Sequence, residues 1–329
     1  MKVVSFFNHK GGVGKTTLLF NVGVALAGLG RRVLFVDADP QANLTGTALA
    51  AQDYQSALDS GQTIYDALLP VIRTTGEPLT PEPVQIRESA WLIPGHILLS
   101  EYEESLAGGW SDTLAGRYPG FQRTTALWRI INAAVSAVAA DVVLIDVGPS
   151  VGALNRVVIL SSDGFVVPLS PDLFSLTALP SVGRAVSTWI GEWHAAVAQA
   201  ERTGVATQIS GGLPAGRPSP VGYISQQFAS YRSAPATAFK RWLEQIPGAY
   251  EREVVEQLRG AGVTIPVPAG QIGTVRNLSS LVPMAQEANA AIFELSGAEA
   301  RGAQYVRARD TLVDFRSLAS EIESRIAQV

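Results

Sequence analysis

The chain has 329 residues with 47% hydrophobic content, a net charge of −4 and a pI near 5.5. This length and composition permit a large buried core, and the acidic balance excludes a protein that binds nucleic acid as a bulk polycation. The sequence contains no cysteine, which excludes disulfides, thiolate catalysis and thiolate metal sites.

The start of the chain predicts a strand, a loop and a helix. Residues 3–7 are an apolar run, and residues 16–29 have the pattern of a helix. The loop between them reads NHKGGVGKTT from Asn8 to Thr17. A glycine-rich loop in this context predicts phosphate binding, because its backbone can approach phosphate oxygens closely and the helix N-terminus presents N–H groups. The predicted nucleotide ligands are Gly11, Gly12, Val13, Gly14, Lys15, Thr16 and Thr17.

Two lysines and a threonine supply the chemistry of this loop. Lys15 is expected to reach the β- and γ-phosphates, because a lysine at a helix N-terminus is unfavourable without an anion nearby. The Thr16 hydroxyl is expected to complete the shell of a magnesium ion. The loop departs from the P-loop pattern G-x-x-x-x-G-K-[ST], since His9 occupies the first glycine position and a second lysine, Lys10, precedes Gly11.

Two further apolar runs end in carboxylates. Residues 33–36 precede Asp37 and Asp39, and residues 142–145 precede Asp146. Such runs are typical of strands buried on both faces of a parallel sheet, and these sheets bind ligands at the carboxyl ends of their strands. Alternation along an extended chain places Asp37 and Asp39 on the same side. Each aspartate also has a simpler interpretation, as a helix cap or a turn former.

The rest of the chain alternates between predicted strands and helices. Further strands are expected at 90–94, 164–169 and 218–224. Helices are expected at 124–139, 173–197, 236–244, 250–261 and 302–327. Pro180 predicts a kink or a break in the helix over 173–197. The proline- and glycine-rich ranges 70–88 and 203–220 are expected to be loops.

This alternation predicts an α/β fold, with a doubly wound, mostly parallel sheet and helices on both faces. We expect residues 1–329 to form a single domain, with elaborations at about 51–125 and 200–270. No signal peptide precedes the first strand, and no stretch is long and apolar enough to span a membrane. A soluble cytoplasmic protein is therefore expected.

The motifs together resemble those of the deviant Walker-A ATPases of the ParA/MinD group, and most of all the ParA partition ATPases. The matching segments are KGGVGKTT from Lys10, VLFVDADPQ from Val33, VVLIDVGPS from Val142 and the weaker Arg276-Asn277-Leu278. Gly148 stands where this family usually has proline. The resemblance is strong over about the first 50 residues and around 142–180, and weak over 51–125 and 200–270. The absence of cysteine excludes the iron–sulfur relatives of this fold.

The resemblance implies an ATPase that uses ATP and Mg²⁺ and forms a homodimer on ATP binding. It also implies a role for each site residue. It implies that Lys10 crosses the dimer interface to the partner's nucleotide, with service to its own subunit as the alternative. It implies that Asp39 positions the attacking water. It places Asp37 and Asp146 in or near the magnesium shell, and Asn277 in the nucleotide site.

The resemblance also implies that the ATP dimer binds duplex DNA without sequence specificity. The candidate arginines are Arg276, Arg301, Arg307 and Arg309. The last three cluster near the start of the final predicted helix, where they could present a positive strip to phosphates. A solvated helix face, with the arginines paired to Asp310 and Asp314, is the alternative.

Three functions remain open on this basis. The first is an ATP-dependent switch that hydrolyses ATP slowly and positions or partitions a cargo. No membrane partner is expected for it; its expected partners are the nucleoid DNA and an unidentified protein that stimulates its ATPase. The second is a MinD-like switch on a membrane surface, which the tail from Ser317 to Val329 disfavours because Arg325 is its only cation. The third is a metabolic ATP-dependent ligase or synthetase on the same scaffold, with a substrate site in the elaborations.

Overall fold

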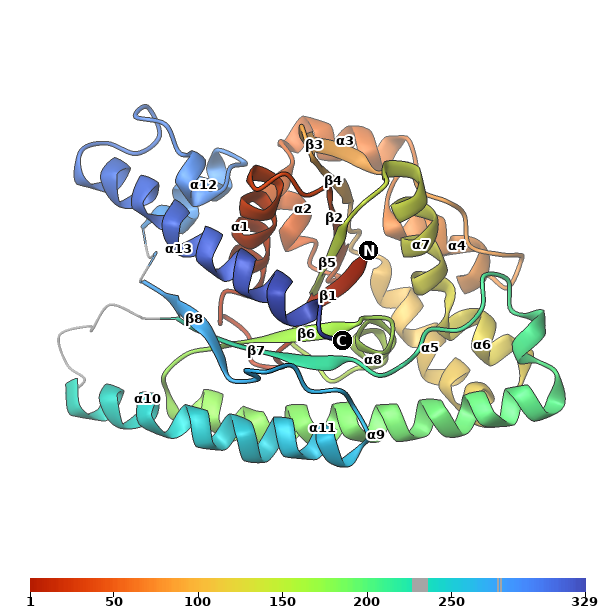
Figure 1. Ribbon diagram of the computed structural model, residues 1–329. Helices are drawn as coiled ribbons and strands as arrows, with labels where there is room; N and C mark the ends of the chain where they lie inside the picture. Colours follow the sequence, from red (N-terminus) through yellow and green to blue (C-terminus); the bar gives the residue numbers. More distant parts are fainter. Residues whose placement is uncertain (227–235, 277, 279) are drawn as a thin grey trace.

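The computed structural model describes residues 1–226, 236–276, 278 and 280–329. Within these residues, eight strands form one sheet in the order β3-β4-β2-β5-β1-β6-β7-β8. The strands are β1 (Lys2–Phe6), β2 (Val33–Ala38), β3 (Val84–Arg87), β4 (Ala90–Ile93), β5 (Val142–Val147), β6 (Gly164–Leu169), β7 (Ser219–Gln226) and β8 (Gln271–Val275). Neighbouring strands are parallel except for the antiparallel pair of β3 and β4. The predicted α/β fold with a mostly parallel sheet is confirmed (Figure 1).

Helices cover both faces of this sheet (Figure 1). One layer contains α1 (Lys15–Gly28), α2 (Asn43–Ala48), α12 (Leu281–Glu287), the short helix η3 (Ile292–Glu294) and α13 (Ala303–Ile326). The opposite layer contains α4 (Ile64–Ile72), α5 (Leu99–Leu114), α6 (Tyr118–Thr124), α7 (Ala126–Val138), α8 (Ala153–Leu160), α9 (Leu173–Thr203), α10 (Ala236–Tyr250), the π-helical turn η2 (Glu251–Val255) and α11 (Glu256–Gly260). Two short connecting helices are α3 (Ala51–Asp59) and η1 (Ala206–Gln208).

The central strands are buried on both faces, as their continuous apolar runs predict. Every residue of β2, β5 and β6 is buried, because helices pack against the sheet from either side. Asp146 of β5 is level with both Phe6 of β1 and Asp37 of β2. The loop after β1 and the carboxylates near the ends of β2 and β5 therefore meet at one edge of the sheet.

The last third of the chain extends the sheet and covers α1. The strands β7 and β8 continue it beyond β6, and α13 packs on α1. Arg325 of α13 is 2% exposed and donates hydrogen bonds to the carbonyl oxygens of Val221 (3.1 Å), Gly270 (2.8 Å) and Gln271 (2.8 Å). This buried guanidinium joins the final helix to the last two strands, β7 and β8, through charge-assisted hydrogen bonds.

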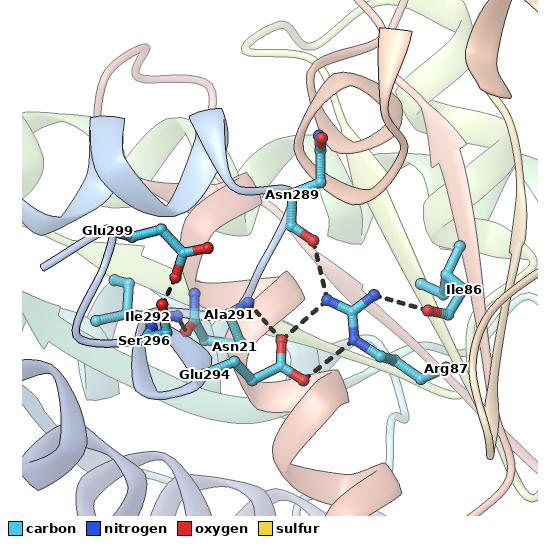
Figure 2. Close-up of polar contacts among 9 residues, drawn as sticks. All are labelled: Asn21, Ile86, Arg87, Asn289, Ala291, Ile292, Glu294, Ser296 and Glu299. Carbon is cyan, nitrogen blue, oxygen red and sulfur yellow. Dashed lines mark hydrogen bonds and ion pairs between the residues drawn. The ribbon is translucent and has the colours of Figure 1, made fainter. Parts of the chain in front are cut away.

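The segment 289–294, between α12 and α13, is fastened to β3 (Figure 2). Arg87 donates from Nε to Glu294 Oε1 at 3.1 Å and from Nη2 to Glu294 Oε2 at 2.9 Å. The same Nη2 donates to the carbonyl oxygen of Asn289 at 2.9 Å. Two parallel bonds between a guanidinium and a carboxylate fix orientation as well as distance, so this contact sets where the segment crosses the first layer.

The same segment is also hydrogen-bonded to α1 and α2, the helices that follow β1 and β2. The buried Asn21 of α1 accepts the N–H of Ile292 at 2.8 Å (Figure 2). The Asn289 carboxamide donates to the carbonyl oxygens of Gly46 (3.1 Å) and Leu49 (2.7 Å), at the end of α2. The segment 289–294 thus holds α1, α2 and β3 together from outside the sheet.

The range 70–88 is not one loop, as predicted, because both of its ends are regular. The helix α4 continues through Pro70 to Ile72, and β3 occupies Val84–Arg87. Pro70 removes one hydrogen bond of α4, and the burial of Leu68 and Val71 offsets part of this cost. Of the kink or break predicted at Pro180, the break is wrong, since α9 runs through this residue. The neighbouring Leu179 is fully buried, and its burial offsets part of the proline penalty.

The two helices predicted at 236–244 and 250–261 form one continuous helical run through α10, η2 and α11. The π-helical turn packs tightly on α9, because a Cβ on Gly183 would lie 1.7 Å from the carbonyl oxygen of Glu253. The range 51–125 contains the strand predicted at 90–94, as β4, and also holds structure that the sequence did not indicate, namely α3 to α6 and β3. None of the helices in the described part of the chain has the length and apolarity of a membrane span.

Candidate functional site

The glycine-rich loop between β1 and α1 has a backbone that favours glycine at two positions. Gly12 and Gly14 have φ angles of 72° and 65°, in the left-handed region. Gly14 also lies against the end of β7, where a Cβ on it would be 2.3 Å from Gln226 Nε2. The loop leads directly into the N-terminus of α1 at Lys15, where helix N–H groups lack partners within the helix. A bound anion would supply those partners.

The first two residues of α1 lie near aspartates at the carboxyl ends of β2 and β5. Lys15 is 8% exposed, and its Nζ lies 3.4 Å from the carbonyl oxygen of Lys10. Burial lowers the pKa of Lys15, whereas the nearby carboxylates of Asp146 and Asp39 raise it. Thr16 Oγ1 donates to Asp146 Oδ2 at 2.7 Å. The fold therefore brings Lys15 and Thr16 to the same place as Asp39 and Asp146.

Three carboxylates lie together beneath this loop. Asp37 and Asp146 are fully buried and Asp39 is 5% exposed. Burial, followed by the charge of Asp37, raises the pKa of Asp146 to about 8, although the Thr16 hydrogen bond lowers it. Burial likewise raises the pKa of Asp37 to about 6. Asp146 Oδ1 has no hydrogen-bond partner among the described residues. The unpaired oxygen of Asp146 and the hydroxyl of Thr16 are hard donors that suit Mg²⁺. No three acidic or histidine side chains of the described residues are grouped so as to hold a metal by themselves, so further ligands would have to come from a nucleotide and water.

Asp39 lies where β2 leads into α2, beside the loop after β5. Its Oδ1 accepts the N–H of Gln41 at 3.0 Å, so Asp39 also forms the turn that its simpler interpretation expects. A Cβ on Gly148 would lie 3.2 Å from Asp39 Oδ1. Glycine at position 148 therefore leaves the Asp39 carboxylate more room than a proline would.

Lys10 does not point into the phosphate loop of its own chain. Its Nζ forms an ion pair with Asp172 Oδ2 at 2.6 Å and lies 5.7 Å from the centre of the Phe174 ring. Asp172 is the N-cap of α9, and its Oδ1 accepts the N–H of Ser175 at 2.7 Å. Phe174 is 71% exposed. The second lysine is thus held at the rim of the site by the first turn of α9.

Sequence reasoning missed two residues that contact the predicted site. Asp172 was visible as an aspartate directly before an apolar helical pattern, which is an N-cap signal. Thr45 donates both its N–H and its hydroxyl to Asp37 Oδ2, so Asp37 acts as a cap for α2 as well. The only sequence signal for Thr45 is a hydroxyl residue shortly after Pro40, which marks the turn into α2.

The arginines proposed for DNA binding fall into two groups. Arg276 and Arg307 line a cavity of about 240 Å³ together with Asp310 and Asp314. Arg276, which precedes α13 in the chain, is 3.5 Å from Asp314 of that helix. Arg301 and Arg309 are exposed nearby at the start of α13. Asn277, which was assigned to the nucleotide site, lies outside the described residues.

The raised pKa of Asp146 predicts how pH affects the ligand-free protein. A folded pKa near 8 exceeds the value of about 3.9 for an unfolded aspartate, so the folded state binds the proton more tightly. Stability should therefore fall as pH rises from 6 to 8, by up to about 1.4 kcal/mol per pH unit. Thermal unfolding at pH 6, 7 and 8 measures this slope. Asp146→Asn should flatten it, and an unchanged slope in that variant would contradict the assignment.

Comparison with known proteins agrees with this geometry. A family model described as an AAA domain matches residues 1–195. The sporulation initiation inhibitor protein Soj of Bacillus subtilis is 32% identical over 185 residues, which are 54% of this chain and 62% of Soj. The first curated relatives are matched over only 49% to 62% of their own length.

Solved structures extend the likeness over more of the chain. A protein from Corynebacterium diphtheriae has a TM-score of 0.71 and 26% identity, covering 88% of this chain and 97% of that one. Cobyrinic acid a,c-diamide synthase from Mycobacterium smegmatis, with bound ADP and magnesium, has a TM-score of 0.50 and 25% identity, covering 76% and 83%.

Proposed function

Because the chain belongs to the AAA domain family, in the ParA/MinD group of P-loop ATPases, we propose that it is an ATP-driven dimerising switch that positions or partitions a cargo. The observation that carries the proposal is the second lysine of the loop. The Lys10 ammonium lies at the rim of the site, paired with Asp172 and beside the exposed ring of Phe174. A cation in that place is suited to a nucleotide on a second subunit.

The residues around the loop have complementary tasks in nucleotide binding. The backbone from Gly11 to Thr17 surrounds the phosphates, and Lys15 neutralises the β- and γ-phosphates. Thr16 and Asp146, already joined by a 2.7 Å hydrogen bond, would hold Mg²⁺, with Asp37 close behind them. When bound, the cation neutralises charge that develops on the transferred phosphoryl group.

Hydrolysis requires a water in line with the γ-phosphate. Asp39 is the carboxylate we assign to that water, because it begins the turn after β2 near Lys15 and has the room that Gly148 leaves. Little covalent chemistry is needed from the protein, since positioning and charge neutralisation supply most of the rate. No strong base other than these carboxylates is proposed, so turnover should be slow, as a switch requires.

The matrix on which the switch works is proposed to be duplex DNA. Arg276 and Arg307 lie together on the layer that contains α13, and dimerisation doubles this modest patch so that both halves reach one duplex. The membrane alternative has less support, because the last turns of α13 include Glu321 and Glu323 beside the buried Arg325.

Three ATPase assays separate the proposed function from its alternatives. Stimulation by duplex DNA of any sequence supports the switch, and stimulation by anionic liposomes supports a membrane-surface role. An ATPase that neither of them stimulates favours a ligase or synthetase. The synthetase alternative is favoured by one observation, the likeness in structure to cobyrinic acid a,c-diamide synthase.

We predict that the ATP dimer binds duplex DNA with a steep dependence on salt, since phosphate contacts release counterions. Arg276→Glu, or Arg307→Glu with Arg309→Glu, should weaken binding about tenfold or more and leave ATP binding unchanged. Arg252→Glu makes the same charge change in η2, in the opposite layer, and should have little effect. Fluorescence anisotropy measures the affinities. A trapped ATP dimer that binds no duplex at low salt would remove the DNA-matrix model.

A further inference from the structure

Asp37 is held by a single residue of α2. Thr45 donates from Oγ1 to Asp37 Oδ2 at 2.7 Å and from its backbone N to the same oxygen at 2.8 Å. Both residues are fully buried. Asp37 Oδ1 has a weaker partner, the N–H of Asp39 at 3.2 Å. One carboxylate oxygen is therefore committed to Thr45, and the other is the less occupied of the two.

The direction of the hydroxyl bond is fixed from the other side. The N–H of Gly95, directly after β4, donates to Thr45 Oγ1 at 2.8 Å. Because the hydroxyl accepts from this N–H, its own hydrogen is available for Asp37, so Asp37 Oδ2 must be the acceptor. Gly95 can approach this closely because it has no side chain, since a Cβ there would lie 2.8 Å from Asp37 Cγ. The chain Gly95, Thr45, Asp37 thus orients the carboxylate from two elements.

The helix α2 depends on the same contact. It has six residues, and its N-cap Ala42 is left-handed with no side-chain cap. The N–H of Thr45 would be unsatisfied without Asp37, because the first N–H groups of a helix lack partners within it. From its other end, α2 is held by the Asn289 carboxamide. Thr45 is therefore placed by contacts at both ends of the helix.

We propose that Thr45 is a positioning residue for the metal side of the site, which orients the Asp37 carboxylate toward the magnesium shell. This inference rests on the proposed function, since it assumes that Asp37 serves a nucleotide-bound cation. When a residue that hydrogen-bonds to a metal-binding carboxylate is removed, the metal affinity typically falls about 10–100-fold. The hydroxyl, and not the methyl group, is the part of Thr45 that performs this role.

The test compares three variants for binding of Mn²⁺ in the presence of AMPPNP, measured by electron paramagnetic resonance. Thr45→Val keeps the shape and removes the hydroxyl, and it should weaken Mn²⁺ about 10–100-fold. Thr45→Ser should restore affinity to within about threefold of the parent, because it retains the hydroxyl. Thr47→Val is the matched control on the same helix, since the Thr47 hydroxyl donates only to the carbonyl oxygen of Asn43, at 2.8 Å, among the described residues.

The outcomes separate this inference from the function on which it rests. Parent-like Mn²⁺ binding by Thr45→Val, or an equal loss in Thr45→Val and Thr45→Ser, would overturn the role of the hydroxyl. A parent protein that binds neither AMPPNP nor Mn²⁺ would instead overturn the proposed function. If Thr45→Val does not fold, as judged by its thermal unfolding, Thr45→Ala takes its place with the same expectation.

Discussion

Asp39→Ala should lower ATP hydrolysis by about 10²–10⁴-fold and leave ATP binding nearly intact. The physical reason is that the proposed role of Asp39 is to position the attacking water, whereas phosphate binding is assigned to the loop and Lys15. Single-turnover hydrolysis and equilibrium binding of a fluorescent ATP analogue measure the two effects separately.

Lys15→Ala is the comparison that gives this result its meaning. Its loss should appear in nucleotide affinity, because the substitution removes the buried cation that is assigned to the phosphates. If both variants lost ATP binding to the same degree, the separation of roles between Asp39 and Lys15 would be wrong. The same Asp39→Ala protein, if it holds ATP, is the bait for a pull-down of the unidentified partner.

Lys10→Ala should stay monomeric under conditions where its parent dimerises with ATP and Mg²⁺. A charge that contacts a nucleotide across the interface, once removed, leaves the phosphates without a partner and costs about 2–5 kcal/mol of association. Light scattering measures the oligomeric state, in the Asp39→Ala background if hydrolysis is too quick. Dimerisation of Lys10→Ala as strong as that of its parent would show that the lysine serves its own subunit.

Asp172→Asn is the matched control for this experiment. Asparagine retains the helix N-cap, whereas the ion pair that holds Lys10 at 2.6 Å is lost. Because the lysine must leave Asp172 before it can cross to another subunit, this variant should dimerise at the same ATP concentration as its parent or at a lower one. A defect in both variants would indicate that the ion pair itself, and not the released lysine, supports the dimer.

The parts of the fold that the sequence predicts are those with local signals. Residues 33–36 and 142–145 are apolar without interruption, so their burial in a parallel sheet follows from composition alone. The loop before α1 needs glycine for backbone reasons, which Gly12 and Gly14 show by their left-handed angles. The carboxylates follow the strands, and parallel strands end at a common edge, so their convergence was also predictable.

The features that were missed depend on contacts between distant segments. Asp172 meets Lys10 across 162 positions of the chain, and Gly95 meets Thr45 across 50. No local pattern records such pairs. The prediction of a break at Pro180 failed for a related reason, because helix propensity is a weak guide that burial in the tertiary structure overrides.

The fastening of α1 by Asn21 to Ile292 also bears on how this protein can be divided. The family match ends at residue 195. The helix α1, which follows the phosphate loop, is nevertheless covered by α13 and hydrogen-bonded to the segment 289–294. A fragment cut at that boundary would leave β6 as an open edge strand, available for pairing with other chains. The segment that the family model matches therefore depends on the C-terminal third for the cover of α1 and for the pairing of β6.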